Sequence, residues 1–175
     1  MPSAFRIDFY LHNPMRRIVL YWLPPVLWMG LIFWFSTDRF SSVETGSRFD
    51  QLIGWVAPWL EEVSRARLHL LIRKLGHFTE YGLLALLWMR AFESGRWSGR
   101  SGEMMGRWRA RALLVILIVA AYALLDEWHQ TLTVSRTGSL VDCAIDTFGG
   151  TAGLLLRRLL TEDEAGADSS IRDGD

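Results

Sequence analysis

Four long apolar stretches are the feature that most constrains how this chain of 175 residues can fold. They occupy residues 18–35, 75–92, 108–128 and 140–160. A helix needs about 20 mostly apolar residues to cross the roughly 30 Å hydrocarbon core of a bilayer. A buried helix of a soluble protein explains any one of these stretches, but four in so short a chain favour a membrane. We therefore predict an all-α membrane protein with four transmembrane helices.

The composition agrees with a membrane protein and narrows the class of partner. Nine tryptophans are a heavy load for this length, and tryptophan concentrates at membrane–water interfaces. The 19 basic residues are balanced by 19 acidic ones, so no basic excess favours a nucleic-acid partner. The single Cys143 excludes an intramolecular disulfide and a cysteine-based structural zinc site.

The first apolar stretch has the basic start of a signal peptide, in Arg16 and Arg17. However, its apolar run is longer than the core of a usual signal peptide and does not end in a small-x-small cleavage site. We expect it to be a retained span. Pro24 and Pro25 inside it are tolerable, because neighbouring helices satisfy the freed backbone groups in a membrane bundle.

The distribution of basic residues predicts the orientation of the four spans. If the N-terminus is cytoplasmic, 12 of the 19 basic residues lie on the cytoplasmic side and 7 on the outer side. Basic residues prefer the cytoplasmic side of a membrane. We therefore expect both termini in the cytoplasm and the long loop 36–73 outside.

Two segments outside the spans have their own patterns. In the outer loop, apolar residues between Phe49 and Leu60 recur at helical spacing, which predicts a short helix lying in the membrane interface. A cap packed over the outer mouth of the bundle is an equally good interpretation. The tail 161–175 is acidic and nearly without apolar residues, so we expect a single domain over 1–160 followed by a disordered tail.

With this topology, the acidic and histidine side chains inside the spans all fall at the outer end of a helix. The second span begins with Lys74, His77, Glu80 and Tyr81, which occupy an arc of roughly 120° on a helical wheel. The third span ends with Asp126, Glu127, His129 and Gln130, and the fourth begins with Ser139, Asp142 and Asp146. Because charges in lipid are costly unless they pair or face water, the three stripes predict one shared pocket that opens outward.

The residue types in this pocket suggest two kinds of chemistry. The candidates for acid–base catalysis, in which a carboxylate orients an imidazole, are His77, Glu80, Asp126, Glu127 and His129. The candidates for binding a ligand are Lys74, Tyr81, Gln130, Arg136, Ser139, Asp142 and Asp146. Lys74 and Arg136 suit a phosphate or a carboxylate. No compact zinc signature is present, so we predict no metal and no cofactor.

The polar residues of the predicted pocket also have a purely structural interpretation. Lys74 with Glu80, or Arg136 with Asp142, could simply hold the helices in register as buried ion pairs. Gly149 and Gly153 continue the stripe of Asp146 deeper into the membrane, and small residues allow helices to approach closely there. His12 and His69 lie outside the predicted cluster.

At these residues the chain resembles the VanZ-like family of small bacterial membrane proteins. The resemblance covers about residues 20–160 and rests on three blocks: Phe35-Ser36, then Lys74-Leu-Gly-His77-Phe-Thr-Glu80-Tyr81-Gly82, then Asp126-Glu127-Trp-His129-Gln130, which continues through Arg136-Thr-Gly138-Ser139-Leu-Val-Asp142 to Asp146 and Gly149. One departure is Thr133-Val134-Ser135 before Arg136, where the family often has a Pro-Gly pair.

The resemblance implies a multi-pass protein of the bacterial cytoplasmic membrane, related to one that raises tolerance to teicoplanin-type glycopeptides. It establishes no catalytic residue. Two hypotheses follow. In the first, the pocket binds a membrane lipid headgroup, a lipid-linked cell-wall precursor or a glycopeptide. In the second, a membrane-embedded enzyme modifies a lipid or wall precursor by His/Asp/Glu acid–base chemistry.

Overall fold

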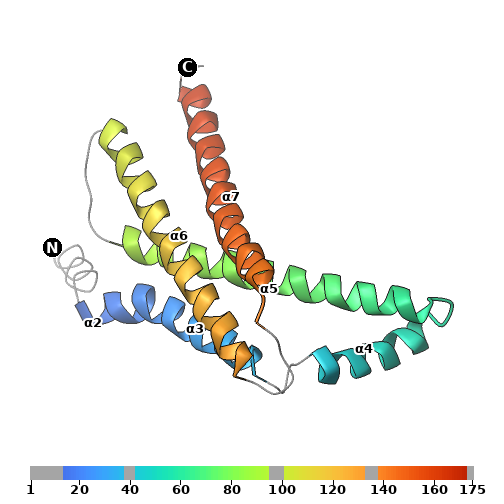
Figure 1. Ribbon diagram of the computed structural model, residues 1–175. Helices are drawn as coiled ribbons and strands as arrows, with labels where there is room; N and C mark the ends of the chain where they lie inside the picture. The colour runs from blue at the N-terminus through green and yellow to red at the C-terminus, as the bar shows by residue number, and fades with distance from the viewer. Residues whose placement is uncertain (1–13, 38–41, 95–100, 133–137, 173–175) are drawn as a thin grey trace.

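The computed structural model describes the backbone of residues 14–37, 42–94, 101–132 and 138–172, with side chains placed over 15–37, 45–94, 106–132 and 138–161. These ranges are almost entirely helical and contain no strand (Figure 1). The elements are α2 (Pro14–Arg17), a π-helical turn (Ile18–Trp22), α3 (Leu23–Phe35), α4 (Ser42–Val56), α5 (Glu62–Glu93), α6 (Ser101–Thr131) and α7 (Leu140–Arg172). The expected all-helical class is confirmed.

The first expected span is a continuous helical segment from Pro14 to Phe35. A proline inside a helix removes one backbone N–H and clashes with the carbonyl four residues earlier. The wide turn over Ile18–Trp22 lies immediately before Pro24 and Pro25, where it relieves that clash. The helix therefore passes through the proline pair without a break.

Two helices in the described part of the chain are long and apolar enough to cross a bilayer. They are Met15–Phe35 and Gly106–Thr131, which contain the first and third expected spans. The second and fourth expected spans lie inside α5 and α7, which do not meet the same measure. Each of these helices carries ionisable residues within its apolar stretch, such as His77 in α5 and Asp146 in α7. Only two of the four expected spans are thus supported by length and composition.

Apolar side chains cover the outward faces of the two qualifying helices. Leu27 and Trp34 of α3 are more than half exposed, as are Leu113 and Leu117 of α6. Soluble monomers rarely expose contiguous apolar patches of this kind. These faces fit a lipid environment.

Helices α5 and α7 cross in close contact, and glycines permit it. A Cβ atom on Gly149 would overlap the carbonyl oxygen of Phe78, and one on Gly153 would lie 2.9 Å from the carbonyl oxygen of Gly82. The expected role of Gly149 and Gly153 in close helix contact is confirmed. Figure 1 shows α7 rising steeply from α5 at this crossing, with α6 antiparallel to α7 and diverging from it.

The core lies where α3, α5, α6 and α7 meet. Its fully buried members include Ile32, Leu84, Met89, Val115, Val119 and Leu154. Two side-chain hydrogen bonds tie α3 to its neighbours. The Trp28 indole N–H donates to the Glu80 carbonyl at 2.9 Å, and the Tyr122 hydroxyl donates to the Met29 carbonyl at 2.5 Å. These bonds fix the position of α3 beside α5 and α6.

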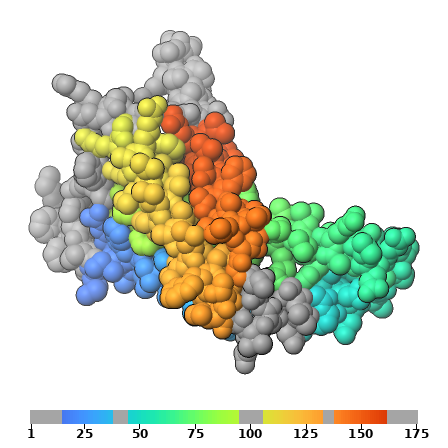
Figure 2. Space-filling view, viewed as in Figure 1, coloured from blue at the N-terminus to red at the C-terminus, as the bar shows by residue number. Residues whose placement is uncertain are grey.

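The first half of α5 and α4 form an arm that projects from the rest of the molecule (Figure 2). At 1.5 Å per residue, α5 is about 48 Å long, well beyond the thickness of a hydrocarbon core. Within the arm, Thr45 Oγ1 lies 3.2 Å from His69 Nε2, and the rings of Phe49 and His69 lie 5.2 Å apart. The arm is therefore a packed helical hairpin.

The expected outer-loop helix is present as α4, with features of both interpretations. Its first turns wall a cavity beside α3 and α5, as a cap would. Farther along, Leu52 and Trp55 are exposed, as is Trp59 just beyond the helix, which suits an interfacial position.

At the other end of the chain, α7 continues past residue 160 to Arg172. The structure thus has helix where a disordered tail was expected, because extending an existing helix needs no new nucleus.

Candidate functional site

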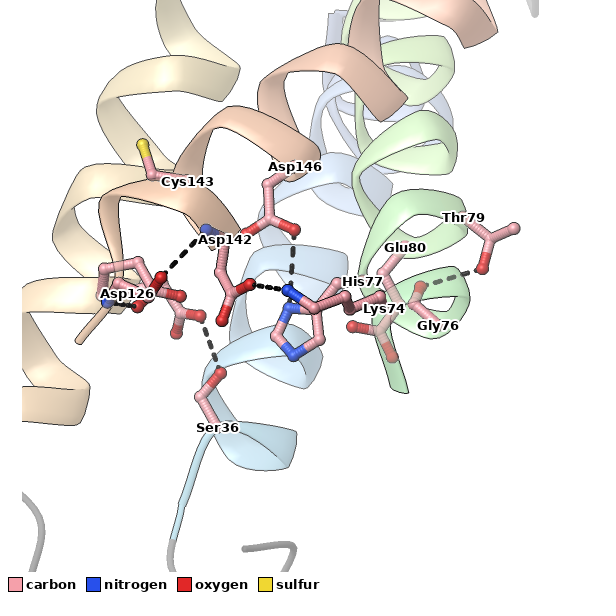
Figure 3. Close-up of polar contacts among 12 residues, drawn as sticks. Ser36, Lys74, Gly76, His77, Thr79, Glu80, Asp126, Asp142, Cys143 and Asp146 are labelled. Atoms are coloured by element: carbon pink, nitrogen blue, oxygen red, sulfur yellow. Dashed lines mark hydrogen bonds and ion pairs between the residues drawn. The ribbon is translucent and has the colours of Figure 1, made fainter. Parts of the chain in front are cut away.

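The end of α3, the middle of α5, the end of α6 and the start of α7 bring most of the predicted polar residues to one place. Figure 3 shows Asp142 and Asp146 of α7 directed toward Lys74 and His77 of α5. In the same view, Ser36 from the end of α3 points to Asp126 of α6. Residues separated by up to 110 positions in the sequence thus form one cluster.

Asp146 and His77 form the deepest polar pair of this cluster. The Asp146 side chain has no exposed surface, and its Oδ1 lies 3.5 Å from Nδ1 of His77. Neither Asp146 oxygen accepts a hydrogen bond from a residue that the structure describes. His77 retains 22% exposure. A buried acid therefore stands behind an imidazole that reaches an accessible surface.

Asp126 is the second buried acid and is held by two donors. It accepts hydrogen bonds from the Ser36 hydroxyl at 2.9 Å and from the Gln130 amide at 3.0 Å. Both bonds reach the same carboxylate oxygen, and the other oxygen, Oδ1, has no hydrogen-bond partner although it is buried. Ser36 thereby connects α3 to the acids of α6.

Glu127 joins the end of α6 to the start of α7. Its Oε2 accepts the backbone N–H of Ser139 at 2.6 Å, and Gln130 donates to its Oε1 at 3.4 Å. Ser139 in turn caps α7, because its Oγ accepts the N–H of Asp142 at 3.3 Å. Gly138 packs against this junction, where a Cβ would lie 2.6 Å from the Glu127 carbonyl oxygen. These contacts give Glu127 and Ser139 a structural function. The catalytic role predicted for Glu127 and the ligand-binding role predicted for Ser139 stay predictions.

Lys74 pairs with Asp142, whose Oδ1 lies 2.5 Å from the ammonium nitrogen. Both side chains are more than a third exposed. The two register pairs considered from the sequence were Lys74 with Glu80 and Arg136 with Asp142, so the observed partner differs. Arg136 lies outside the described residues.

His129 and Tyr81 lie at the flanks of the cluster. The His129 ring packs on Phe33 with centroids 4.3 Å apart, and its Nδ1 is buried without a hydrogen bond. Tyr81 is fully buried beside Tyr122 at 6.2 Å, and its hydroxyl also lacks a hydrogen bond. Tyr81 thus lies in the protein interior and His129 is partly exposed, and the predicted ligand-binding and catalytic roles of these two residues stay predictions.

A cavity of about 380 Å³ lies in front of this cluster. Only two of the predicted residues, His77 and Glu80, line it. Ser36 lines it too and leads to Asp126 behind it. The other walls come from the arm and the end of α3: Phe35, Thr45, Phe49, His69, Ile72, Arg73 and Gly76. The cavity is therefore lined by both polar and apolar side chains.

His69 and Arg73 are cavity residues that the sequence reasoning missed. They precede His77 on the same face of α5, at intervals of four residues, so helical spacing contained the signal. They were left out because the expected span began at residue 75, whereas α5 begins at Glu62. Burial, followed by the charge of Arg73, lowers the pKa of His69. One guanidinium nitrogen of Arg73 is buried without a hydrogen bond.

Among the residues that the structure describes, no three His, Cys, Asp or Glu side chains converge in a way that could hold a metal ion. The cluster is instead a set of acid–histidine, acid–hydroxyl and acid–ammonium contacts. Such a set can bind a polar group and can move protons.

Comparison with protein families identifies the chain. The VanZ/LLP1 family model matches residues 21–161. The chain belongs to the VanZ/LLP1 family. No curated protein and no solved structure matches it.

The family match covers every element of the cluster in this VanZ-like protein. It includes α3, the arm, the helix crossing and the start of α7. The three sequence blocks that resemble the family supply the contacting pairs of the cluster, which are Ser36 with Asp126, Lys74 with Asp142 and His77 with Asp146. Ser36 and His77 line the cavity.

Proposed function

We propose that this VanZ-like protein is a four-span protein of the bacterial cytoplasmic membrane that binds the polar headgroup of an amphiphile in the cavity beside α4. The observation that carries the proposal is the composition of that cavity. Arg73 supplies positive charge and His69 and His77 supply hydrogen-bond donors, while Phe35, Phe49 and Ile72 supply apolar surface. A phosphate-bearing headgroup with the first part of its chain needs both kinds of wall.

The depth of the cavity supports a lipid ligand. With α5 and α7 as the second and fourth spans and both termini in the cytoplasm, the cavity lies at the outer surface of the membrane. Buried ionisable groups within membrane helices usually face a ligand or a water-filled space. A lipid-linked cell-wall precursor has this chemistry and this location, and a contribution to teicoplanin-type glycopeptide tolerance would arise from holding such a precursor.

Binding to a defined probe tests the proposal. The full chain in phosphatidylcholine nanodiscs is titrated with a polyprenyl diphosphate, and binding is followed by the shift in thermal unfolding. Arg73→Gln and His77→Ala should each weaken binding about tenfold or more, the loss expected for a charged hydrogen bond. Arg48→Gln is the matched control, since Arg48 lies on α4 and does not line the cavity. Equal binding by all four proteins would reject the proposal.

A second candidate function rests on the His77–Asp146 pair. A buried carboxylate that orients an imidazole at a cavity surface is the arrangement of a general acid–base catalyst. In this version the protein modifies the lipid or wall precursor rather than only holding it. Lipid analysis of deletion and overexpression strains separates the two functions, because an altered lipid or precursor species requires the enzyme. Accumulation of an unchanged, protein-bound species requires the binding function alone.

A further inference from the structure

A second hollow lies at the opposite end of α5 and α7 from the cavity. It has a volume of about 470 Å³ and a floor of leucines: Leu86, Leu87, Leu156 and Leu160. Gly153, at the close contact of α7 with α5, also lines it. Arg90 follows His77 by 13 residues on α5, so the two ends lie about 20 Å apart along the helix. We call this hollow the inner groove.

Two arginines stand on the rim of the inner groove. Arg90 lies over the Tyr21 ring, with the guanidinium carbon 5.1 Å from the ring centroid. Arg157 forms an ion pair with Glu93 through Nη2. Its other terminal nitrogen, Nη1, is buried and has no hydrogen bond to any residue that the structure describes. The Arg157 guanidinium therefore has hydrogen-bonding capacity that its ion pair with Glu93 does not use.

Other arginines lie at the same level of the molecule. Arg17 Nε donates to the Ser94 hydroxyl at 3.2 Å, which places the start of the first helical segment beside the end of α5. Arg158 lies over the Trp108 ring at 4.8 Å. Basic side chains and tryptophan at one depth are typical of the cytoplasmic membrane interface.

We propose that the inner groove binds one anionic phospholipid of the cytoplasmic leaflet. An acyl chain lies on the leucines, and the phosphate accepts hydrogen bonds from the guanidinium groups of Arg90 and Arg157. Charge complementarity selects an anionic over a zwitterionic lipid, because among the side chains that the structure describes at this groove, Glu93 balances one of the two guanidinium groups. Basic pockets between membrane helices on the cytoplasmic side commonly bind anionic headgroups. The inference rests on the proposed membrane topology but not on a ligand in the outer cavity.

Native mass spectrometry of the full chain tests this site. The protein is extracted with equal amounts of phosphatidylglycerol and phosphatidylcholine, and the lipids that remain bound are counted. The wild type should retain one phosphatidylglycerol at least about fivefold in preference to phosphatidylcholine. Arg90→Gln should reduce this preference at least threefold, and the double variant Arg90→Gln/Arg157→Gln should abolish it. Arg158→Gln, at the same depth but off the groove, is the matched control.

Arg90→Gln leaves the Arg157–Glu93 pair intact, so this variant keeps the test valid if the double variant is unstable. Equal retention of the two lipids by the wild type, or an equal loss in Arg158→Gln, would overturn the proposal. Displacement of the lipid by soluble glycerol 3-phosphate at similar concentration would also overturn it, since a phosphate site would then suffice. Titration of the groove variants with polyprenyl diphosphate should give wild-type binding, which separates this site from the outer cavity.

Discussion

The two ends of the α5–α7 pair differ in the sign and the burial of their charged side chains. At the outer end, acids are buried between helices: Asp146 is sealed behind His77, and Asp126 is held by Ser36 and Gln130. At the inner end, Arg90, Arg157 and Arg158 stand around the edge of an apolar groove or lie on aromatic rings. The glycine crossing at Gly149 and Gly153 lies between the two ends.

This difference has a physical meaning. Basic side chains at the periphery of a membrane bundle anchor its depth and orientation at little cost. Acids enclosed between helices lose solvation, and unsatisfied oxygens such as those of Asp146 add no stability. Residues retained at such a cost are expected to serve binding or chemistry. The comparison therefore supports the two proposals: ligand binding or chemistry at the end that holds Asp146, and anchoring with a lipid site at the end that holds Arg157.

Filling the glycine crossing should have the largest effect, because it would separate the two ends. Gly149→Leu forces a side chain into the Phe78 backbone and should lower the free energy of unfolding by about 3 kcal/mol or more. Denaturant unfolding in detergent measures it. Gly106→Ala is the control, since a Cβ there meets nothing within 4 Å and Ala favours helix over Gly. Comparable stability of the two variants would contradict the observed packing.

Replacing the buried acid separates a functional from a structural interpretation of the outer end. Asp146→Asn removes the charge with little change in volume, so we expect unfolding stability to stay equal or rise. Binding of the polyprenyl diphosphate, or teicoplanin tolerance in a strain that depends on the protein, should fall about tenfold. Immunoblotting of the membrane fraction checks that the variant accumulates. Loss of the protein together with loss of the phenotype would mean that Asp146 is structural.

Glu127 offers a sharper distinction within the same cluster. Glu127→Ala leaves the Ser139 N–H without its acceptor and should cost about 1–3 kcal/mol of stability, measured by thermal unfolding. Glu127→Gln retains an acceptor oxygen and should recover most of that loss and full binding. If Glu127→Gln were stable but inactive, the result would favour the catalytic role that the sequence predicts for Glu127 over a structural role.

We expect the smallest effect in the arm, where the titration of His69 should make stability depend on pH. Because the pKa of His69 in the folded protein lies below its ordinary value of 6.5, the unfolded chain binds more protons near that pH. The stability of the arm is thus fully present above pH 6.5 and falls as the pH drops through 6.5 toward the lowered pKa. Hydrogen exchange of α4 between pH 5 and 8 should show this trend, and His69→Gln should remove it. A stability that rises toward acid would reverse the assignment.

Much of the outer end could be predicted from the sequence. Helical periodicity placed His77 and Glu80 on one face, and the ends of the apolar stretches put Asp126, Asp142 and Asp146 at the same depth. The structure then brings Asp146 to His77 and Asp142 to Lys74. Periodicity cannot show which acid meets which base, because that depends on how α5 and α7 cross.

The arm was the part that the sequence left unresolved. Hydropathy marks where α5 becomes apolar, at residue 75, but not where the helix begins, at Glu62. His69 and Arg73 therefore fell outside the predicted site although they share a face with His77. In the same way, the acidic composition of the tail suggested disorder, whereas the helix of α7 extends to Arg172.

Photo-crosslinking tests the central claim most directly. A polyprenyl diphosphate with a photoreactive group beside the diphosphate is bound to the full chain in nanodiscs, and the labelled peptides are identified by mass spectrometry. The account predicts labelling of the cavity wall around Phe49 and Ile72, reduced at least about fivefold by Arg73→Gln and unchanged by Arg48→Gln. Labelling concentrated at the inner groove around Leu156, or spread evenly over the lipid-facing helices, would contradict it.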